Sequence, residues 1–188
     1  MSAPPELPGI VSRAFEVSRR AGYVAFCRNE TGRLLASLAA TRTGTLAEFG
    51  TGTGVGTAWL RSGVRGQVRI LTAELDPELA GAAAEMFVDD DQVEVVAADW
   101  STLTDKGPFS LLFLDAHESG ESSADAVADL VEPGGLVVLD DFNPCESWPP
   151  VADGRVDVLR EQWLTDERFT TAEVMVAPDA AVLIATKR

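Results

Sequence analysis

Five short apolar runs alternate with longer stretches of helical spacing, and this alternation limits the fold of the chain more than any other feature. Parallel strands need a crossover of helix length between them, so the pattern predicts an α/β fold whose parallel sheet carries helices on both faces. The expected strands are residues 45–49, 68–73, 93–97, 111–114 and 136–139.

The last part of the chain departs from this alternation. A helical stretch at residues 155–164 is followed by two further apolar runs, at 171–176 and 181–186. A turn at residues 177–179 joins these runs, and strands joined by so short a turn must be antiparallel. The chain therefore ends in a predicted hairpin.

The N-terminal part is expected to be helical. Residues 10–27 and 32–40 have helical spacing, interrupted by Gly22 and by a polar segment at 29–32 that predicts a turn. We expect residues 1–44 to cover the site or form an interface and residues 45–188 to form the core. The length of 188 residues and the 46% hydrophobic content fit one domain overall.

Composition excludes some partners and predicts a location. The formal net charge of −15 opposes binding to a phosphate backbone, so no nucleic-acid partner is expected. No apolar run approaches the ~20 residues of a membrane span, and the N-terminus has no basic start followed by an apolar run. Cys27 and Cys145 lie far apart and are expected to be free thiols. We expect a cytoplasmic protein with no membrane partner.

A glycine-rich segment follows the first expected strand. Glycines occupy every second position from Gly50 to Gly56, which allows backbone close to a ligand and turn dihedrals that a side chain would oppose. This spacing differs from the dinucleotide pattern G-x-G-x-x-G, whose third glycine position holds Thr57 here.

Acidic residues end the next two expected strands. Glu74 can accept hydrogen bonds from two ribose hydroxyls, and Asp99 with Trp100 can contact an adenine ring. Two alternatives remain open: glycine turns with acidic strand ends occur in many α/β folds, and Trp100 suits a hydrophobic core equally well. Residues 142–154, rich in proline, are expected to form a loop at a ligand-binding edge of the sheet.

Five motifs in order resemble the class I S-adenosylmethionine-dependent methyltransferases, and among them the catechol and caffeoyl-CoA O-methyltransferase-like group. The motifs are EFGTGTG, TAELDP, AADW, LFLDAH and EPGGLVVLDD, and the likeness extends to the C-terminus. The resemblance implies a Rossmann-like three-layer sandwich with a seven-stranded, mostly parallel sheet whose last strand is antiparallel.

The resemblance also implies a site for S-adenosylmethionine. Glu48 and the glycine turn would approach the methionine part, Glu74 would hold the ribose, and Asp99 with Trp100 would flank the adenine. The implied cofactor-binding residues are Glu48, Gly50, Thr51, Gly52, Gly54, Glu74, Asp99, Trp100 and Asp115.

Metal-dependent relatives imply a second ligand. The matching positions are Asp115, Asp140 and Asp141, three carboxylates that suit Mg²⁺ and that would lower the pKa of a bound hydroxyl. Asp141 stands where those relatives have asparagine. The alternative is that these aspartates cap helices or lie in solvent at strand ends.

One implied catalytic position is altered. Glu118 stands where the family has its general-base lysine, so His117, the single histidine, is the expected replacement base beside Asp115. The alternative for His117 is a solvated surface position.

We therefore expect an enzyme that methylates an oxygen of a small hydroxylated acceptor. Tyr23, Phe142 and Trp148 would suit an aromatic acceptor, although they suit core packing equally well. The alternatives are a non-catalytic cofactor-binding module or partner subunit, and a nicotinamide-dependent oxidoreductase, for which the chain lacks a substrate domain. The resemblance also favours a homodimer.

Overall fold

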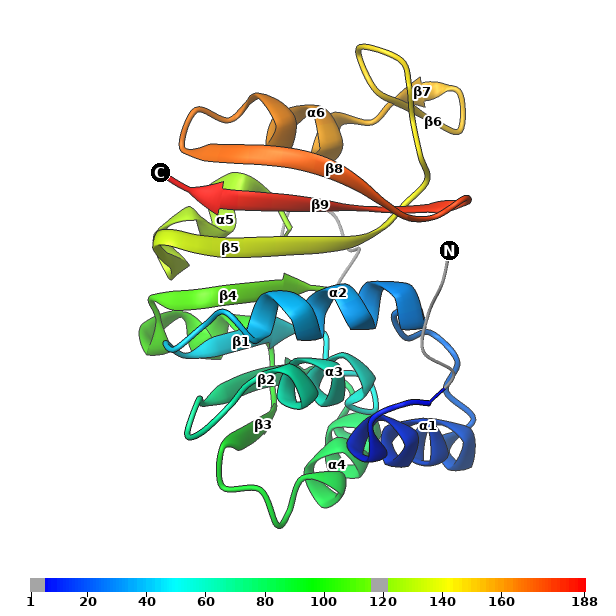
Figure 1. Ribbon diagram of the computed structural model, residues 1–188, viewed down its shortest axis with the longest axis vertical. Coiled ribbons are helices and arrows are strands. Elements are labelled where there is room, and N and C mark those ends of the chain that lie inside the picture. The colour runs from blue at the N-terminus through cyan, green and yellow to red at the C-terminus, as the bar shows by residue number, and fades with distance from the viewer. Residues whose placement is uncertain (1–5, 116–121) are drawn as a thin grey trace.

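A computed structural model of the chain describes residues 6–115 and 122–188. Its centre is a seven-stranded sheet in the order β3-β2-β1-β4-β5-β9-β8, and Figure 1 shows the strands stacked from bottom to top with helices in front and behind. The strands are β1 Leu46–Phe49, β2 Ile70–Glu74, β3 Val93–Ala97, β4 Phe109–Leu114, β5 Val131–Phe142, β8 Phe169–Ala177 and β9 Ala180–Lys187.

Strand directions agree with the sequence prediction. β1 pairs in parallel with β2 and β4, and the parallel pairing continues to β3 and β5. β9 runs antiparallel to both of its neighbours, β5 and β8. The mostly parallel, seven-stranded sheet with an antiparallel last strand is therefore confirmed.

Helices form the two outer layers. One hydrophobic cluster packs α1, α2, α3 and part of α4 on one face, and a second packs η1, α5 and α6 on the other. The helices are α1 Gly9–Ala21, α2 Asn29–Ala39, α3 Val55–Gly63, α4 Pro77–Met86, α5 Ala124–Val127 and α6 Val158–Thr165, with short 3₁₀ turns η1 Trp100–Lys106 and η2 Ala128–Leu130.

The polar turn predicted at residues 29–32 is wrong, because α2 begins at Asn29. Gly32 is inside this helix, where a Cβ atom would lie 2.2 Å from Nε1 of Trp59. The glycine therefore permits close contact between α2 and α3. Rules based on local sequence instead interpret a glycine in a polar segment as a turn.

The predicted loop at residues 142–154 also needs correction. It contains β6 Val151–Ala152, which pairs antiparallel with β7 Arg155–Val156 in a small hairpin. The following helix starts later than expected, at Val158, because the side chain of Asp157 accepts a hydrogen bond from the Arg160 backbone N–H at 3.0 Å and caps it.

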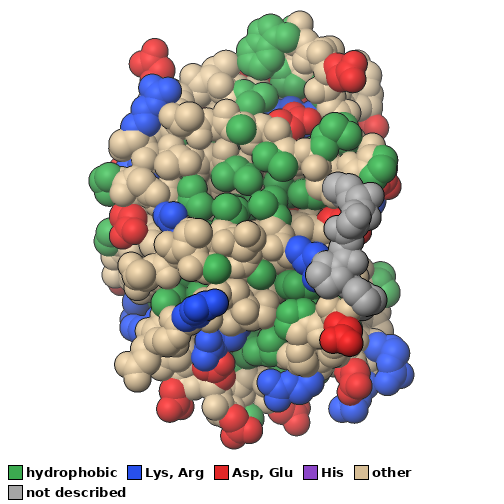
Figure 2. All heavy atoms as spheres, in the orientation of Figure 1, with side chains coloured by type: hydrophobic (Ala, Val, Ile, Leu, Met, Phe, Trp, Pro, Cys, Tyr) green, Lys and Arg blue, Asp and Glu red, His purple; other side chains and the backbone are tan. Residues whose placement is uncertain are grey.

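Apolar and charged side chains separate on the face that carries α2. Figure 2 shows hydrophobic side chains gathered across the middle of this face, and acidic and basic side chains mainly towards its ends. Cys27 is buried in the first cluster and Cys145 is partly exposed, and both are free thiols, as predicted. Within the described ranges, no helix is long and apolar enough to span a bilayer.

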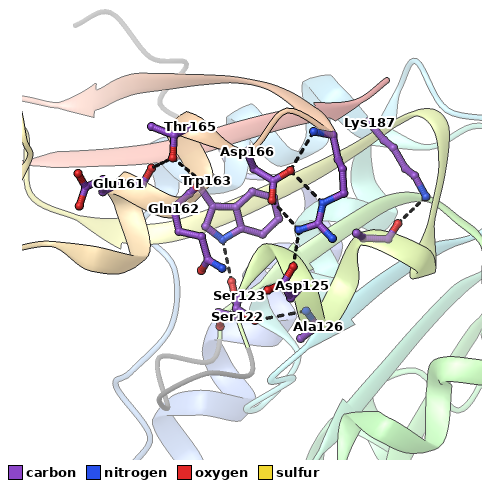
Figure 3. A network of polar contacts seen from close by, with 12 residues as sticks. Ser122, Ser123, Asp125, Ala126, Glu161, Gln162, Trp163, Thr165, Asp166 and Lys187 are labelled. Atoms are coloured by element: carbon purple, nitrogen blue, oxygen red, sulfur yellow. Dashed lines mark hydrogen bonds and ion pairs between the residues drawn. The ribbon is translucent and has the colours of Figure 1, made fainter.

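A polar network holds the C-terminal helix against the chain that leads into α5 (Figure 3). Nε1 of the fully buried Trp163 donates a hydrogen bond to the carbonyl oxygen of Ser122 at 2.7 Å. Arg168 contacts the carboxylates of Asp125 and Asp166 at 2.6 and 2.5 Å. The contacts of Trp163 with Ser122 and of Arg168 with Asp125 join segments that are some forty residues apart in the chain.

Replacing Trp163 with phenylalanine is expected to lower the free energy of unfolding by about 2 kcal/mol. The variant loses buried volume and the donor to Ser122, and a buried carbonyl that loses a partner costs about 1–3 kcal/mol. Urea denaturation measures the change. Trp148→Phe is the matched control, since Trp148 is 64% exposed and should change stability by less than about 0.5 kcal/mol. Equal effects of the two variants would contradict this role of Trp163.

Candidate active site

The sheet reverses its winding between β1 and β4, and a cavity opens at the carboxyl ends of the strands there. Open α/β sheets bind their ligands at such a point. The cavity has a volume of about 530 Å³, sufficient for a ligand of nucleoside size. It is lined by Tyr23, Gly50, Ala73, Glu74, Leu75, Asp76, Ala98, Asp99, Trp100 and Asp115.

The glycine turn connects β1 to α3 beside this cavity. Gly50, Gly52 and Gly54 have positive φ angles of 92°, 52° and 89°, which side chains disfavour. The backbone N–H groups of Gly50 and Thr51 donate to the carbonyl oxygen of Ala73 at 3.0 and 3.2 Å. The turn is therefore fixed to the end of β2.

Glu74 lies at the junction of the turn and β2. One carboxylate oxygen accepts a hydrogen bond from the Gly52 backbone N–H at 2.7 Å, and the other accepts from the Asp76 backbone N–H at 2.9 Å. These two bonds hold the carboxylate at the cavity wall, where each oxygen retains capacity for a further donor.

Glu48 lies beneath the turn and does not line the cavity. Its side chain is fully buried and accepts hydrogen bonds from the hydroxyls of Thr57 and Thr72, while Oε1 has no hydrogen-bond partner among the described residues. Burial raises the pKa of Glu48 from 4.5 to about 8, against the opposing effect of the two hydroxyls. A Cβ atom at Gly56 would lie 2.0 Å from Oε1, so this glycine leaves room for the carboxyl.

Asp99 and Trp100 lie side by side on the cavity wall. The carboxylate of Asp99 caps η1 by accepting from the Ser101 backbone N–H at 2.9 Å, and hydrogen bonding to Ser101 lowers its pKa. The ring of Trp100 stacks on Phe49 with centroids 4.7 Å apart. Trp100 therefore packs on the core and also lines the cavity, and its contact with an adenine ring stays a prediction.

The three aspartates expected to hold a metal differ in their surroundings. Asp115 lines the cavity, and its pKa is raised by burial and then by the charges of Glu48, Asp140 and Asp141. Asp140 is buried and accepts a hydrogen bond from the Thr31 hydroxyl at 3.0 Å.

Asp141 is exposed and has a φ angle of 65°. In the parts of the chain that the structure describes, no three acidic, cysteine or histidine side chains are grouped closely enough to hold a metal ion. The present geometry does not fit Mg²⁺, and the metal site stays a prediction.

The expected base lies outside the described residues. His117, and Glu118 at the position of the family lysine, both belong to residues 116–121. The catalytic role of His117 stays a prediction.

The three aromatic residues expected to contact an acceptor have different surroundings. Trp148 is 64% exposed, and Phe142 is buried beneath the guanidinium of Arg160, 5.0 Å from its ring centroid. Tyr23 alone of the three lines the cavity. The sequence carries no local signal for this position of Tyr23, because it depends on how the connection between α1 and α2 packs over the glycine turn.

Sequence and structure comparisons identify the family. Residues 47–142, just over half of the chain, match a family model described as a methyltransferase domain. The chain belongs to this methyltransferase family. The matched residues span β1 to the end of β5 and contain the glycine turn, Glu74, Asp99 and the three aspartates. No curated protein sequence matches the chain significantly.

Solved structures resemble this methyltransferase over nearly its whole length. The O-methyltransferase TomG of Streptomyces achromogenes, solved with S-adenosylmethionine, is 21% identical, with a TM-score of 0.77 over 97% of this chain and 92% of TomG. A Bacillus cereus O-methyltransferase in complex with S-adenosylhomocysteine is 20% identical, with a TM-score of 0.76 over 97% of this chain and 93% of its own.

A candidate caffeoyl-CoA O-methyltransferase from Staphylococcus aureus is 15% identical, with a TM-score of 0.73 over 95% of this chain and 92% of its own. At these identities, the likeness of this methyltransferase to the solved structures shows the fold alone.

Proposed function

We propose that this methyltransferase transfers a methyl group from S-adenosylmethionine to a hydroxyl oxygen of a small acceptor. The observation that carries the proposal is the cavity at the winding reversal, whose wall places Glu74 beside the glycine turn and Asp99 beside Trp100. Fold relatives solved with S-adenosylmethionine and S-adenosylhomocysteine support the choice of cofactor.

Different residues would bind the ribose, the adenine and the methionine part of the cofactor. Glu74 would accept hydrogen bonds from the ribose hydroxyls, and Asp99 with the ring of Trp100 would contact the adenine. The backbone at Gly50 would lie against the methionine part. Glu48 would act indirectly, by supporting the turn from beneath.

The reaction depends more on aligning the acceptor oxygen with the methyl carbon than on activating either reactant. The acceptor oxygen attacks the methyl carbon, the bond from that carbon to sulfur breaks, and the hydroxyl proton passes to a base or to water. Because the sulfonium is already an activated electrophile, holding the two reactants in line can supply much of the rate enhancement.

A divalent ion would lower the pKa of the acceptor hydroxyl if one bound at Asp115, Asp140 and Asp141. In the described part of the chain, these three side chains are not grouped closely enough to hold such an ion together.

Titration calorimetry with S-adenosylhomocysteine, followed by transfer of labelled methyl from S-adenosylmethionine to a panel of phenols, catechols and alcohols, tests the proposal. We expect micromolar binding and a methylated product, measured in parallel with Mg²⁺ and with EDTA. Binding without turnover on the whole panel would favour the non-catalytic module. Absence of binding would refute the proposed cofactor.

A further inference from the structure

Tyr23 is held over the cofactor cavity by the end of α1. Its backbone N–H donates to the Ser18 carbonyl oxygen at 3.0 Å, just after Gly22 ends the helix in a left-handed conformation. The hydroxyls of Ser18 and Thr53 are 2.5 Å apart, which links this helix end to the glycine turn. The position of Tyr23 is therefore coupled to the turn that it covers.

The ring of Tyr23 occupies the space that a side chain at Gly52 would need. A Cβ atom at Gly52 would lie 2.8 Å from Cε1 of the ring and 3.0 Å from its hydroxyl oxygen. The Gly52 N–H donates to Glu74. The aromatic ring thus lies above the middle of the turn and next to a carboxylate on the cavity wall.

The surroundings of this ring are acidic. Among the described residues that line the cavity, four are acidic, Glu74, Asp76, Asp99 and Asp115, and none is a lysine or an arginine. Burial, and then the charges of Asp115 and Glu74, raises the pKa of the Tyr23 hydroxyl. These acidic side chains therefore disfavour ionisation of the hydroxyl, and Tyr23 stays a neutral aromatic group in the lining of the cavity.

We propose that Tyr23 and the acidic wall recognise the positive charge of the sulfonium, so that the cavity binds S-adenosylmethionine more tightly than S-adenosylhomocysteine. This inference rests on the proposed function. An aromatic face attracts a cation, and the Glu74 carboxylate, which is bound to the Gly52 N–H beside the ring, strengthens the preference. Tyr23 is then a residue that determines specificity for the charged form of the cofactor.

This preference has a consequence for turnover. The cofactor and its product share the adenosine, the ammonium and the carboxylate, and they differ by one methyl group and one positive charge. Transfer of the methyl group therefore removes the feature that the Tyr23 ring recognises. The product is expected to dissociate more readily than the cofactor.

Titration calorimetry with three ligands tests the inference. The probes are S-adenosylmethionine, S-adenosylhomocysteine and sinefungin, which carries an ammonium group near the sulfonium position. We expect the wild-type protein to bind both cationic ligands at least about tenfold more tightly than S-adenosylhomocysteine. Tyr23→Leu should reduce this ratio about three- to tenfold, the range expected for a cation–π contact.

Tyr23→Phe is the matched control, because it keeps the ring and removes only the hydroxyl. Its ratio should equal that of the wild type within about twofold. Equal affinity of the wild type for all three ligands would overturn the inference, even if the leucine variant failed to fold. An unchanged ratio in Tyr23→Leu, with all three ligands weakened alike, would do the same. Absence of binding by every ligand would instead refute the proposed function on which the inference rests.

Discussion

Replacing Glu74 with alanine is expected to weaken binding of S-adenosylhomocysteine at least about 100-fold. Hydrogen bonds to a charged group contribute about 1.5–3 kcal/mol each, and ~1.4 kcal/mol corresponds to a tenfold change in affinity. The alanine variant would lose the hydrogen bonds from two ribose hydroxyls. It would also lose the hydrogen bond that the carboxylate accepts from the Gly52 N–H at 2.7 Å, which fixes the middle of the glycine turn. Titration calorimetry measures the effect directly.

Two further variants separate the causes of that loss. Glu74→Gln keeps the shape and one acceptor oxygen, so its affinity should lie between those of the wild type and the alanine variant. Glu78→Ala removes the same charge from an exposed position that does not line the cavity, and it should bind like the wild type. Wild-type affinity in Glu74→Ala, with an unchanged unfolding temperature, would show that Glu74 does not hold the cofactor.

Replacing Glu48 with glutamine is expected to remove part of the pH dependence of stability. Burial raises the pKa of this carboxyl from 4.5 to about 8 in the folded protein. Between these values the folded state keeps a proton that the unfolded chain has released. Stability that is fully present below the unfolded pKa is therefore lost as the pH rises towards the folded pKa. Glutamine does not ionise, so the Glu48→Gln variant does not lose stability in this way.

Urea denaturation at a series of pH values measures this difference. One such group changes the free energy of unfolding by about 1.4 kcal/mol for each pH unit in the affected interval. Relative to the wild type, Glu48→Gln should gain on the order of 3 kcal/mol between about pH 5 and pH 8. Burial and then the charge of Glu48 raise the pKa of Asp115, so Asp115 adds to the pH dependence of both proteins, and less in Glu48→Gln.

Glu85→Gln provides the control for this series, because Glu85 is exposed on α4. Its free energy of unfolding should follow the wild-type pH profile. Parallel profiles for the wild type and Glu48→Gln would mean that the folded protein ionises Glu48 near its ordinary pKa, and the account of its burial beneath the turn would fail.

The direction of the Glu48 side chain is a feature of the site that the sequence alone does not predict. Its position at the end of β1 predicts a polar group near the cofactor. Its actual contacts depend on Thr57 in α3 and Thr72 in β2, two elements that pack around β1. No local pattern states that the side chain points beneath the turn instead of into the cavity.

The N-terminal connection gives a second case. Spacing predicts helical structure over residues 10–27, which contain Tyr23, with an interruption at Gly22. The structure instead ends α1 at Ala21 and places Tyr23 outside a helix. Contact between the tyrosine ring and Gly52 joins residues that are 29 positions apart in the chain. The same limit applies to β6 and β7, whose short hairpin lies in a segment that proline content alone describes as a loop.

The sequence by itself determined the parallel strands, the antiparallel end of the sheet, the glycine turn and the acidic strand ends. These depend on hydrophobic period, turn chemistry and the length of connections, which are properties of short segments. Only the tertiary structure decided that Glu48 is buried, that Tyr23 covers the turn, and that Asp115, Asp140 and Asp141 have different surroundings. Those outcomes depend on burial and on contacts between distant segments, and such contacts exist only once the helices have packed on the sheet.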